Sequence, residues 1–461
     1  MFIGGVYVMK FKDHFKSNAS FYKDLWIIAL PIALQQLVTS SLNMVDTLMV
    51  GKVGVDAVAA VGVSNQYYFL LNMIMFGIYS GGMVYFAQYW GKKDVKSIHR
   101  LLGFTLVLGG ILSIIFGGLA FFIPEKIISI FTPDVAVQSL GAQYLKIACL
   151  SYPFMILSFG YSMGLRAVEK PKFSMIASII ALTLNTILNY LLIFGAFGLP
   201  QLGVIGAAIA TLVSRIVEFI LIMFFAYFKT ETMNPKLSVL LSFNKELISK
   251  LITTSLPVVI NECFWGLGTT AYLVIYGQIN VESISIMNIV TSIFNIFFIA
   301  AIGVGHASTV MLGKQLGAGE KDKTYDHAIL FLKTGVVLGI LSSLILIACI
   351  PLILPMYQNF ESSTLKLMGQ VLVIFAFGLT FRFINIINIV GIFRAGGDTK
   401  YAMILELGIL WTVGVLGAFI AVNLFNAPLL IVAMIVQLEE IVKVVIGIFR
   451  VRSKKWINTL V

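Results

Sequence analysis

Residues 100–123, RLLGFTLVLGGILSIIFGGLAFFI, carry one charge at their first position and none thereafter. About 20 mostly apolar residues are enough for a helix to cross the hydrocarbon core of a bilayer. The whole chain shares this character, because 59% of its 461 residues are hydrophobic and only 11% are charged. A soluble fold cannot bury that much apolar side chain, and the runs are too long for the alternating strands of a membrane barrel. The sequence therefore predicts an all-α, polytopic membrane protein.

Similar runs follow one another along the chain and predict about twelve membrane-spanning helices in two sets of six. They lie near 25–50, 57–89, 100–123, 137–165, 173–196 and 203–228, and then near 250–277, 285–312, 327–354, 366–393, 402–424 and 427–449. The longest connection, 229–249, separates the two sets. We therefore expect two six-helix lobes, 1–235 and 236–461.

The basic residues orient the chain in the membrane. If the N-terminus is inside, the inner segments hold most of the 32 Lys and Arg residues, whereas the outer loops hold only Lys52, Lys126 and Lys366. Cytoplasmic loops carry such an excess of Lys and Arg. The bias predicts a protein of the plasma (inner) membrane with both termini in the cytoplasm. The net charge of +11 is spread over short loops, which argues against nucleic acid as a partner.

The two halves resemble each other at a nearly constant spacing. Pro31 and Pro257, Gly51 and Gly277, Gly77 and Gly303, and Gly91 and Gly317 are each 226 residues apart. Later, RAVEKPKFSMI at 166–176 matches RAGGDTKYAMI at 394–404 with a spacing of 228. An even number of spans in each copy keeps both copies in the same topology, so the repeat is parallel. Two like bundles around a cleft are a physical basis for alternating access.

A first candidate site combines one acid with neutral oxygens. Asp46 lies in the outer part of the first span, Asn185 and Asn189 share one face of the fifth, and Thr211 lies at a similar depth in the sixth. One carboxylate among neutral oxygens suits a monovalent cation, so Na+ is the predicted metal and H+ the alternative coupling ion. A purely structural interpretation also stays open, in which Asp46 lies in the headgroup layer and the other groups make packing hydrogen bonds.

A second candidate is Glu262, near the middle of the seventh span. The repeat pairs it with the neutral Gln36, and an acid at the membrane midplane is more often functional than structural. Pro31 and Pro257 lie five residues before Gln36 and Glu262, and proline frees a backbone carbonyl. We predict that the two prolines are hinges of the first and seventh spans.

The other charges within the runs favour structural roles. Arg215 with Glu218, and Glu439 with Lys443, have the spacing of helical ion pairs. Arg382 is near the midplane, where it would pair with Glu262 or with backbone carbonyls. Glu406 is expected near the inner interface. The sequence contains no phosphate-binding loop, no metal-spaced His/Cys cluster and no nucleophile motif, so we predict no cofactor and no enzymatic activity.

Three motifs carry a family resemblance. VDTLMVGKVG at 45–54, NYLLIFG at 189–195 followed by GAAIAT at 206–211, and GIFRAGGDTKY at 391–401 resemble the multidrug and toxic compound extrusion (MATE) family, in the right order over nearly the whole chain. The resemblance implies an antiporter that exports organic, often cationic, compounds in exchange for Na+ or H+. It also implies that Asp46 is a coupling residue with Asn185, Asn189 and Thr211 nearby, and that Glu262 matches an acid important in one branch.

The sequence departs from the family in two places. Some members have Asp where this chain has Asn189, and the branch with the acid at Glu262 often adds an acid in the tenth span. That span, FRFINIINIVGIF at 381–393, has only Asn385 and Asn388. We therefore favour Asp46 as the main coupling group and assign Glu262 a secondary or substrate-facing role.

The resulting prediction is a monomeric exporter whose partners are organic small molecules and membrane lipids. Aromatic and Met side chains would line its cleft, with Tyr67, Tyr68 and Phe264 as candidates. The alternative is a flippase for a lipid-linked oligosaccharide of related architecture. A flippase should have a cleft rich in Arg and Lys for a diphosphate, and the sequence indicates mainly Arg382 there.

Overall fold

The computed structural model describes residues 18–242, 244–357 and 360–461, and within these ranges all regular structure is helical. Lys10, Lys12 and Lys16, together with the start of the predicted first lobe, lie outside the described residues.

The first lobe contains the helices from α2 to α9. They are α2 (Ala19–Gly51), α3 (Val55–Gly91), α4 (Val95–Phe122), the short α5 (Pro124–Ser129), α6 (Val135–Ala148), η1 (Cys149–Ser151), α7 (Tyr152–Ala167), α8 (Pro171–Phe194), η2 (Ala196–Gly198) and α9 (Gly203–Phe228).

The second lobe follows the short connecting helix α10 (Leu237–Leu240). Its helices are α11 (Lys245–Ile279), α12 (Val281–Gly317), α13 (Lys321–Ile353), η3 (Leu354–Tyr357), α14 (Ser362–Ile386), η4 (Ile387–Phe393), α15 (Thr399–Ile409), η5 (Leu410–Leu416), α16 (Gly417–Phe425) and α17 (Leu429–Arg452). The turns η4 and η5 are π-helical and continue α14 and α15 without a break. The predicted boundary between 235 and 236 stays a prediction, since it falls inside the connection.

Among the described residues, eleven helices are long and apolar enough to cross a membrane. They match the first eleven predicted runs, with α6 and α7 forming one span and α15 and α16 another. The twelfth run corresponds to α17, which has 24 residues but carries Glu439, Glu440 and Lys443 in its middle. The prediction of an all-α, polytopic membrane fold is confirmed, with eleven of the about twelve predicted spans among the described residues. The twelfth, α17, stays a prediction.

Local sequence sets where several helices begin. The side chains of Asp94, Asp134, Asn244 and Asn280 accept hydrogen bonds from the first free backbone amides of α4, α6, α11 and α12. These short polar side chains are preferred there because they satisfy amides that have no partner within the helix. The short connections between spans therefore have well-defined ends.

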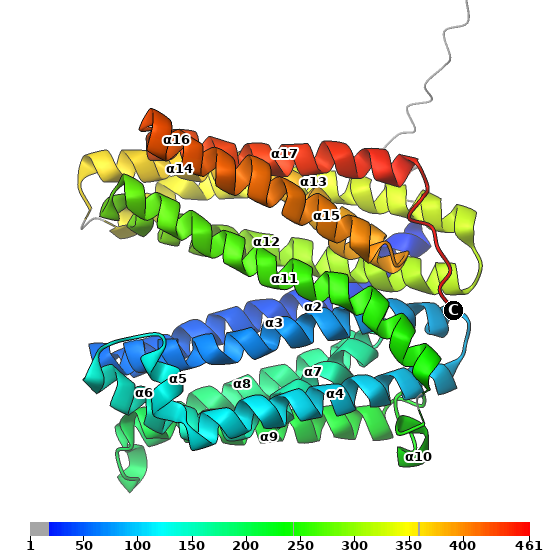
Figure 1. Cartoon of the computed structure of the whole chain (residues 1–461), viewed down its shortest axis with the longest axis horizontal. Helices are drawn as coiled ribbons and strands as arrows, with labels where there is room; N and C mark the ends of the chain where they lie inside the picture. Colours follow the sequence, from blue (N-terminus) through cyan, green and yellow to red (C-terminus); the bar gives the residue numbers. More distant parts are fainter. Residues whose placement is uncertain (1–17, 243, 358–359) are drawn as a thin grey trace, which may run out of the picture.

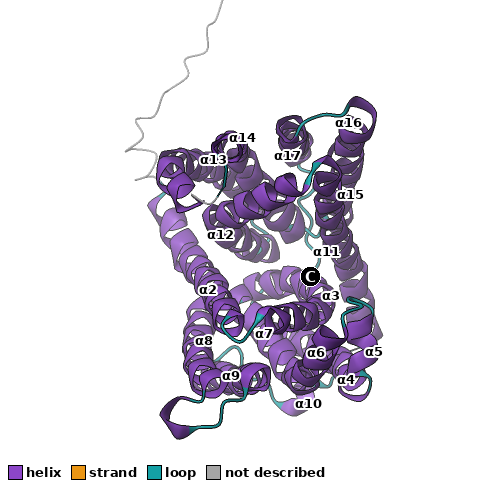
Figure 2. Ribbon diagram, turned by 90° about the vertical axis from the view of Figure 1, so that its left-hand side faces the viewer, coloured by secondary structure: helices purple, strands orange, loops and turns teal. Residues whose placement is uncertain are grey.

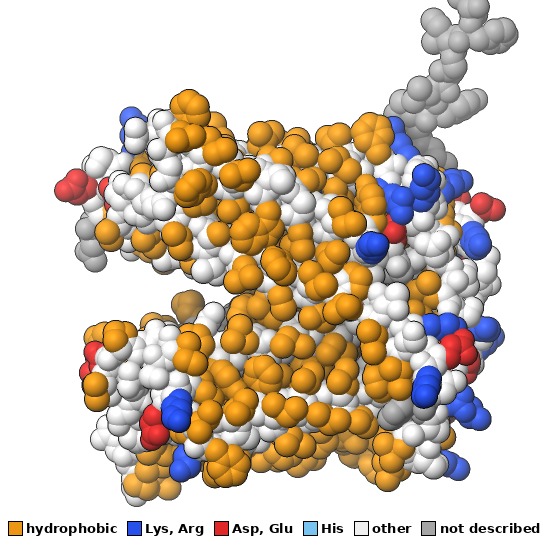
Figure 3. Space-filling view, in the orientation of Figure 1, with side chains coloured by type: hydrophobic (Ala, Val, Ile, Leu, Met, Phe, Trp, Pro, Cys, Tyr) orange, Lys and Arg blue, Asp and Glu red, His pale blue; other side chains and the backbone are white. Residues whose placement is uncertain are grey.

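The two lobes lie one above the other with their helices along the long axis (Figure 1). Figure 2, seen from one end of the helices, shows them as two separate bundles. Figure 3 shows hydrophobic side chains over the flank of both lobes, while Lys and Arg gather at the end near the C-terminus. Many apolar side chains are exposed, among them Ile114, Phe228 and Leu352, with exposed fractions of 67%, 75% and 73%. A surface of this kind suits lipid, and the chain is a multi-pass membrane protein.

The internal repeat is visible in the packing between the lobes. Residues 77–89 of α3 and 303–313 of α12 are buried on all sides, and these stretches begin 226 residues apart. A Cβ atom on Gly91 would collide with the carbonyl oxygen of Lys314, and one on Gly317 would collide with that of Gln88. Because Gln88 and Lys314 are also 226 apart, the repeat relates these two contacts to each other. Glycine is needed here because the two backbones touch.

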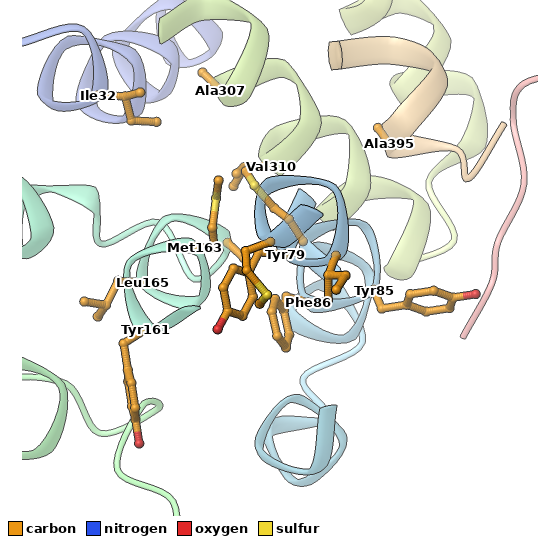
Figure 4. Packing of buried hydrophobic residues seen from close by; sticks show 14 of the residues in the cluster. Ile32, Tyr79, Tyr85, Phe86, Tyr161, Met163, Leu165, Ala307, Val310 and Ala395 are labelled. Atoms are coloured by element: carbon orange, nitrogen blue, oxygen red, sulfur yellow. The ribbon is translucent and has the colours of Figure 1, made fainter. Parts of the chain in front are cut away.

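Buried aromatic side chains fill the space beside this crossing. Tyr79 and Phe86 of α3 pack with Met163 of α7 and Val310 of α12 (Figure 4). The hydroxyl of Tyr79 donates to the carbonyl oxygen of Ile156 at 3.0 Å, which satisfies its one polar group. One continuous core therefore joins both lobes at this level.

The lobes also touch at the end that carries the basic residues. Gln88 of α3 donates to the carbonyl oxygen of Ala395 at 2.9 Å, and its Oε1 accepts from the backbone N–H of Leu460 at 2.7 Å. Nζ of Lys314 on α12 lies 2.7 Å from Oε2 of Glu169, which follows α7. The C-terminal segment thus bridges the two lobes and helps to close this end of the molecule.

Candidate functional site

A cavity of about 930 Å³ lies between the two lobes. Both lobes line it, and Figure 3 shows the molecule hollowed between them at the end opposite the Lys and Arg residues. Its lining combines aromatic side chains, among them Tyr68, Phe76 and Trp265, with many charged and amide side chains. The cavity therefore has one open and one closed end, and a more polar wall than the composition suggested.

The predicted first site lies on the wall formed by the first lobe. Asn189 of α8 donates through Nδ2 to Oδ1 of Asp46 on α2, at 2.7 Å. With the nitrogen of Asn185 turned toward the same carboxylate, Nδ2 lies 3.1 and 2.8 Å from its two oxygens. Oδ1 of Asn185 then accepts from the backbone N–H of Thr211 on α9 at 3.3 Å. The structure brings the four residues together, and their role as a cation site stays a prediction.

This cluster fits a small cation in its chemistry. No Lys, Arg or His nitrogen of the described chain lies within ion-pair distance of Asp46. Oδ1 of Asn189 is buried and has no hydrogen-bond partner among the described residues. An uncompensated carboxylate next to a free amide oxygen is a suitable start for a cation site, because hard cations prefer oxygen ligands. In the described ranges, no group of three or more His, Cys, Asp or Glu side chains has the arrangement of a metal site.

A chain of hydrogen bonds crosses the same wall closer to the closed end. Arg166 of α7 donates to Oε1 of Gln35 at 3.0 Å, and Nε2 of Gln35 donates to Oγ of Ser178 at 2.8 Å. Ser178 donates to Glu218 at 2.7 Å, and Glu218 forms an ion pair with Arg215 at 2.7 Å. The predicted Arg215–Glu218 pair is confirmed, and it belongs to a network that joins α2, α7, α8 and α9.

Glu262, the second predicted site residue, faces the cavity from α11 of the other lobe. Its partner is Arg394, at 2.7 Å, and not Arg382 as one of the two expectations had it. Arg394 also donates to Oγ of Ser80 on α3, at 2.8 Å. Gln36, the repeat mate of Glu262, lines the cavity as well. The acid predicted in the second lobe is therefore neutralised by a buried arginine.

Pro31 and Pro257 lie inside the continuous helices α2 and α11. Each occupies the same position in its copy of the repeat, in a helix that lines the cavity. Their role as hinges stays a prediction.

Arg382 belongs to a second charged cluster on the α14–α17 side of the cavity. It lies 3.8 Å from Glu440 of α17, and its guanidinium carbon is 5.2 Å from the ring centres of Phe294 and Phe298. Asn385 donates to Glu440 at 2.7 Å, and Lys443 forms an ion pair with Glu439, as its spacing predicted. The acid missing from the tenth span is thus supplied by α17.

The sequence analysis did not place several of the cavity-lining residues in the cavity. Arg166 and Arg394 belong to the basic residues that the charge bias assigns to the inner segments between the predicted spans, yet their exposed fractions are 8% and 2%. Glu406 was expected near the inner interface, but it lines the cavity and accepts from Asn261 at 2.6 Å. The matching RA of the two repeat copies was the available signal for Arg166 and Arg394. Of the aromatic side chains predicted to line the cavity, Tyr68 does so. Tyr67 is instead buried and donates to the carbonyl oxygen of Phe116. Phe264 is 47% exposed.

Comparison with known proteins identifies the family. The MatE family model matches residues 31–191 and again 257–420, so the second match starts 226 residues after the first, at the spacing of the repeat. The chain belongs to the MatE family. This membership confirms the resemblance found in the three sequence motifs.

Curated relatives of this MatE chain extend over most of its length. The probable multidrug resistance protein YoeA of Bacillus subtilis is 26% identical over 413 residues, which cover 88% of each chain. The probable multidrug resistance protein NorM of Thermotoga maritima is 26% identical over 415 residues, which cover 88% of this chain and 87% of that protein.

Solved structures share the fold. A MATE transporter in complex with MaL6 gives a TM-score of 0.85 at 17% identity and covers 94% of this chain and 97% of that one. A mutant of the Vibrio cholerae MATE transporter VcmN gives a TM-score of 0.86 at 16% identity, with coverage of 96% and 99%.

Proposed function

We propose that this MatE protein is a secondary active multidrug exporter that expels organic, often cationic, compounds in exchange for Na+ or H+ by alternating access. The names of its relatives and the cavity between its lobes support a transporter rather than an enzyme. The single observation that carries the coupling is Asp46, a cavity acid with amide donors and, among the described residues, no Lys, Arg or His nitrogen within ion-pair distance.

The orientation belongs to the same proposal. Lys and Arg gather at the closed end (Figure 3), and cytoplasmic segments are rich in these residues. The cavity would then open to the outside of the plasma membrane, with both termini in the cytoplasm. In this state a cation from outside reaches Asp46 and favours release of the exported compound, and the loaded carrier returns to face inward.

The membrane potential sets the size of the driving force. One positive charge that moves inward across 100 mV releases about 2.3 kcal/mol. For an uncharged compound, this corresponds to a roughly fiftyfold ratio across the membrane. If one cation is exchanged for one singly charged cationic compound, no net charge moves, and the concentration gradient of the coupling ion alone drives export. An acid already neutralised by an internal cation, such as Glu262 beside Arg394, binds no further cation without breaking its ion pair. Asp46 is free of that cost, which is why we assign it the coupling role.

The basic residues that line the cavity bear on the flippase alternative. Five basic residues line the cavity, not mainly one as the sequence indicated: Arg166, Arg215, Arg382, Arg394 and Lys443. Four of them have a carboxylate partner within 4.0 Å. Because paired cations offer little net charge to a diphosphate, the drug exporter is the better-supported function.

Efflux from proteoliposomes tests the proposal. Ethidium efflux is measured under an imposed Na+ gradient and, separately, under an imposed pH gradient, for the wild type and for Asp46→Asn and Glu262→Gln. One gradient should drive efflux by the wild type, and Asp46→Asn should reduce the driven rate at least tenfold. Full driven efflux by Asp46→Asn contradicts the coupling assignment. Gradient-independent movement of a lipid-linked oligosaccharide, without ethidium efflux, favours the flippase.

A further inference from the structure

Arg166 is a buried cation without an anion. Its exposed fraction is 8%, and it lines the cavity from α7. Nη2 donates to the neutral Gln35 at 3.0 Å, Nη1 lies 3.9 Å from Sδ of Met163, and Nε has no partner. Within the described ranges, no carboxylate oxygen comes within 4.0 Å of this guanidinium. A buried charge without a partner is costly, so a cavity-facing arginine of this kind needs an explanation.

The second lobe shows what a compensated arginine looks like at the same place in the fold. Arg394, the repeat mate of Arg166, has Glu262 at 2.7 Å and Ser80 at 2.8 Å. In the first lobe, the position of Glu262 is taken by the neutral Gln36. The first copy of the repeat therefore keeps the arginine but lacks the acid that would neutralise it.

Two hydroxyl groups continue the same face of α7. Ser158, Ser162 and Arg166 are spaced by four residues, which places them in one row along the helix, and all three line the cavity. Oγ of Ser158 is buried and has no hydrogen-bond partner among the described residues. The row thus presents the guanidinium of Arg166 to the cavity, with the hydroxyl of Ser162 one turn away. These are groups that bind a carboxylate, and the planar guanidinium matches its two oxygens.

Aromatic rings flank this row. Phe159 of α7 is stacked with Phe76 of α3, with ring centroids 6.2 Å apart and an interplanar angle of 19°. His306 meets Phe76 edge-on at 6.3 Å, and all three rings line the cavity. Flat apolar rings beside a cationic row suit a ligand that carries its carboxylate on an aromatic body.

We propose that Arg166, together with the hydroxyl of Ser162 one turn away, forms a subsite for the carboxylate of an aromatic organic anion or zwitterion. The inference rests on the proposed function, since the ligand is then an exported compound. Gln35 and Arg166 meet 11 residues before Asp46 on α2, which is about 16 Å along the helix. The subsite is therefore separate from the acid, and cargo carboxylate and coupling ion do not compete for one group.

Two dyes that differ only at their carboxyl group test this subsite. Rhodamine 110 carries a free carboxylate and rhodamine 123 is its methyl ester. Dissociation constants are measured by fluorescence anisotropy on the purified full chain. Arg166→Gln should weaken rhodamine 110 binding about tenfold or more and change rhodamine 123 binding less than about threefold, because only the free acid makes the charged contact.

A second variant tests the same charge without removing the arginine. Gln35→Glu places a carboxylate at the oxygen that already accepts from Arg166, so it should also lose rhodamine 110 selectively. Lys366→Gln is the matched control, since it removes one positive charge from an exposed position that does not line the cavity. It should leave both dissociation constants unchanged. If Arg166→Gln does not fold, the dissociation constants of the two dyes for Gln35→Glu test the subsite.

Three results overturn the inference. They are wild-type protein that fails to bind rhodamine 110, equal losses for both dyes in the variants, and no loss in either variant. The proposed function is judged separately by gradient-driven efflux. Driven efflux of rhodamine 123 without any carboxylate selectivity refutes the subsite alone.

Discussion

The two lobes have the same backbone plan but different charges on their cavity walls. In the first lobe, Asp46 has only amide partners and Arg166 has only Gln35 and a methionine sulfur. In the second lobe, Glu262 and Arg394 neutralise each other at 2.7 Å. Arg166 and Arg394, which are repeat mates, thus differ in their electrostatic partners and not in their place in the fold.

This difference separates two uses of buried charge. A paired acid and base hold helices together, as Arg394 does between α11, η4 and α3. An acid with hydrogen-bond donors but no cation keeps its capacity for an ion from outside. The comparison therefore supports our proposal that ion exchange takes place in the first lobe, while the second holds a more fixed charge network.

The largest expected contrast is in stability. Arg394→Gln leaves Glu262 without its cation, and breaking a buried pair from one side costs about 3–5 kcal/mol. Arg166→Gln removes one neutral hydrogen bond and relieves an unpaired charge, so it should cost at most about 1 kcal/mol. Thermal unfolding of the purified variants measures both. The double variant Arg394→Gln with Glu262→Gln should recover much of the loss. Equal losses for the two single arginine variants would contradict the comparison.

A smaller effect tests the similarity of the lobes. Gly91→Ala and Gly317→Ala each place a Cβ against a carbonyl oxygen of the other lobe at the closed end. Overpacking of this kind costs about 1–3 kcal/mol, so both should shift the protein toward opening at that end. Labelled cysteines placed across the lobes report the opening by their distance distribution. Gly118→Ala is the control, because nothing lies within 4 Å of its added Cβ. Opening by one variant only would show that the two contacts are not equivalent.

The sequence predicted the parts of this arrangement that depend on local composition and on the repeat. Apolar length predicted the spans, the spacing of 226 matched Gly91 with Gly317, and the four-residue spacing put Asn185 and Asn189 on one face. The three sequence motifs indicated the family. Each of these features is written within one helix or one pair of matched segments.

The missed features depend on which helices meet in space. Arg166 and Arg394 directly follow the predicted runs 137–165 and 366–393. Arg166 still belongs to α7, which ends at Ala167, and Arg394 is the residue after η4, yet both side chains are buried in the protein. The predicted charge pair within α17 was Glu439 with Lys443, and no role was predicted for Glu440, which accepts a hydrogen bond from Asn385 of α14. Glu406 was expected at the membrane interface. Its partner, Asn261, lies 145 residues earlier in the chain, so the sequence does not show that the two side chains meet. Partners on other helices cannot be assigned from hydrophobic periodicity alone.

The central claim is that Asp46 links ion binding to compound binding, and linkage makes this directly measurable. If an ion and a compound are coupled, each changes the affinity of the other by the same factor. The dissociation constant of ethidium is measured on purified protein as a function of Na+ concentration and of pH. The account predicts that the wild type binds ethidium more weakly as one of these ions increases, and that Asp46→Asn removes this dependence. An ion dependence that survives unchanged in Asp46→Asn would contradict the account.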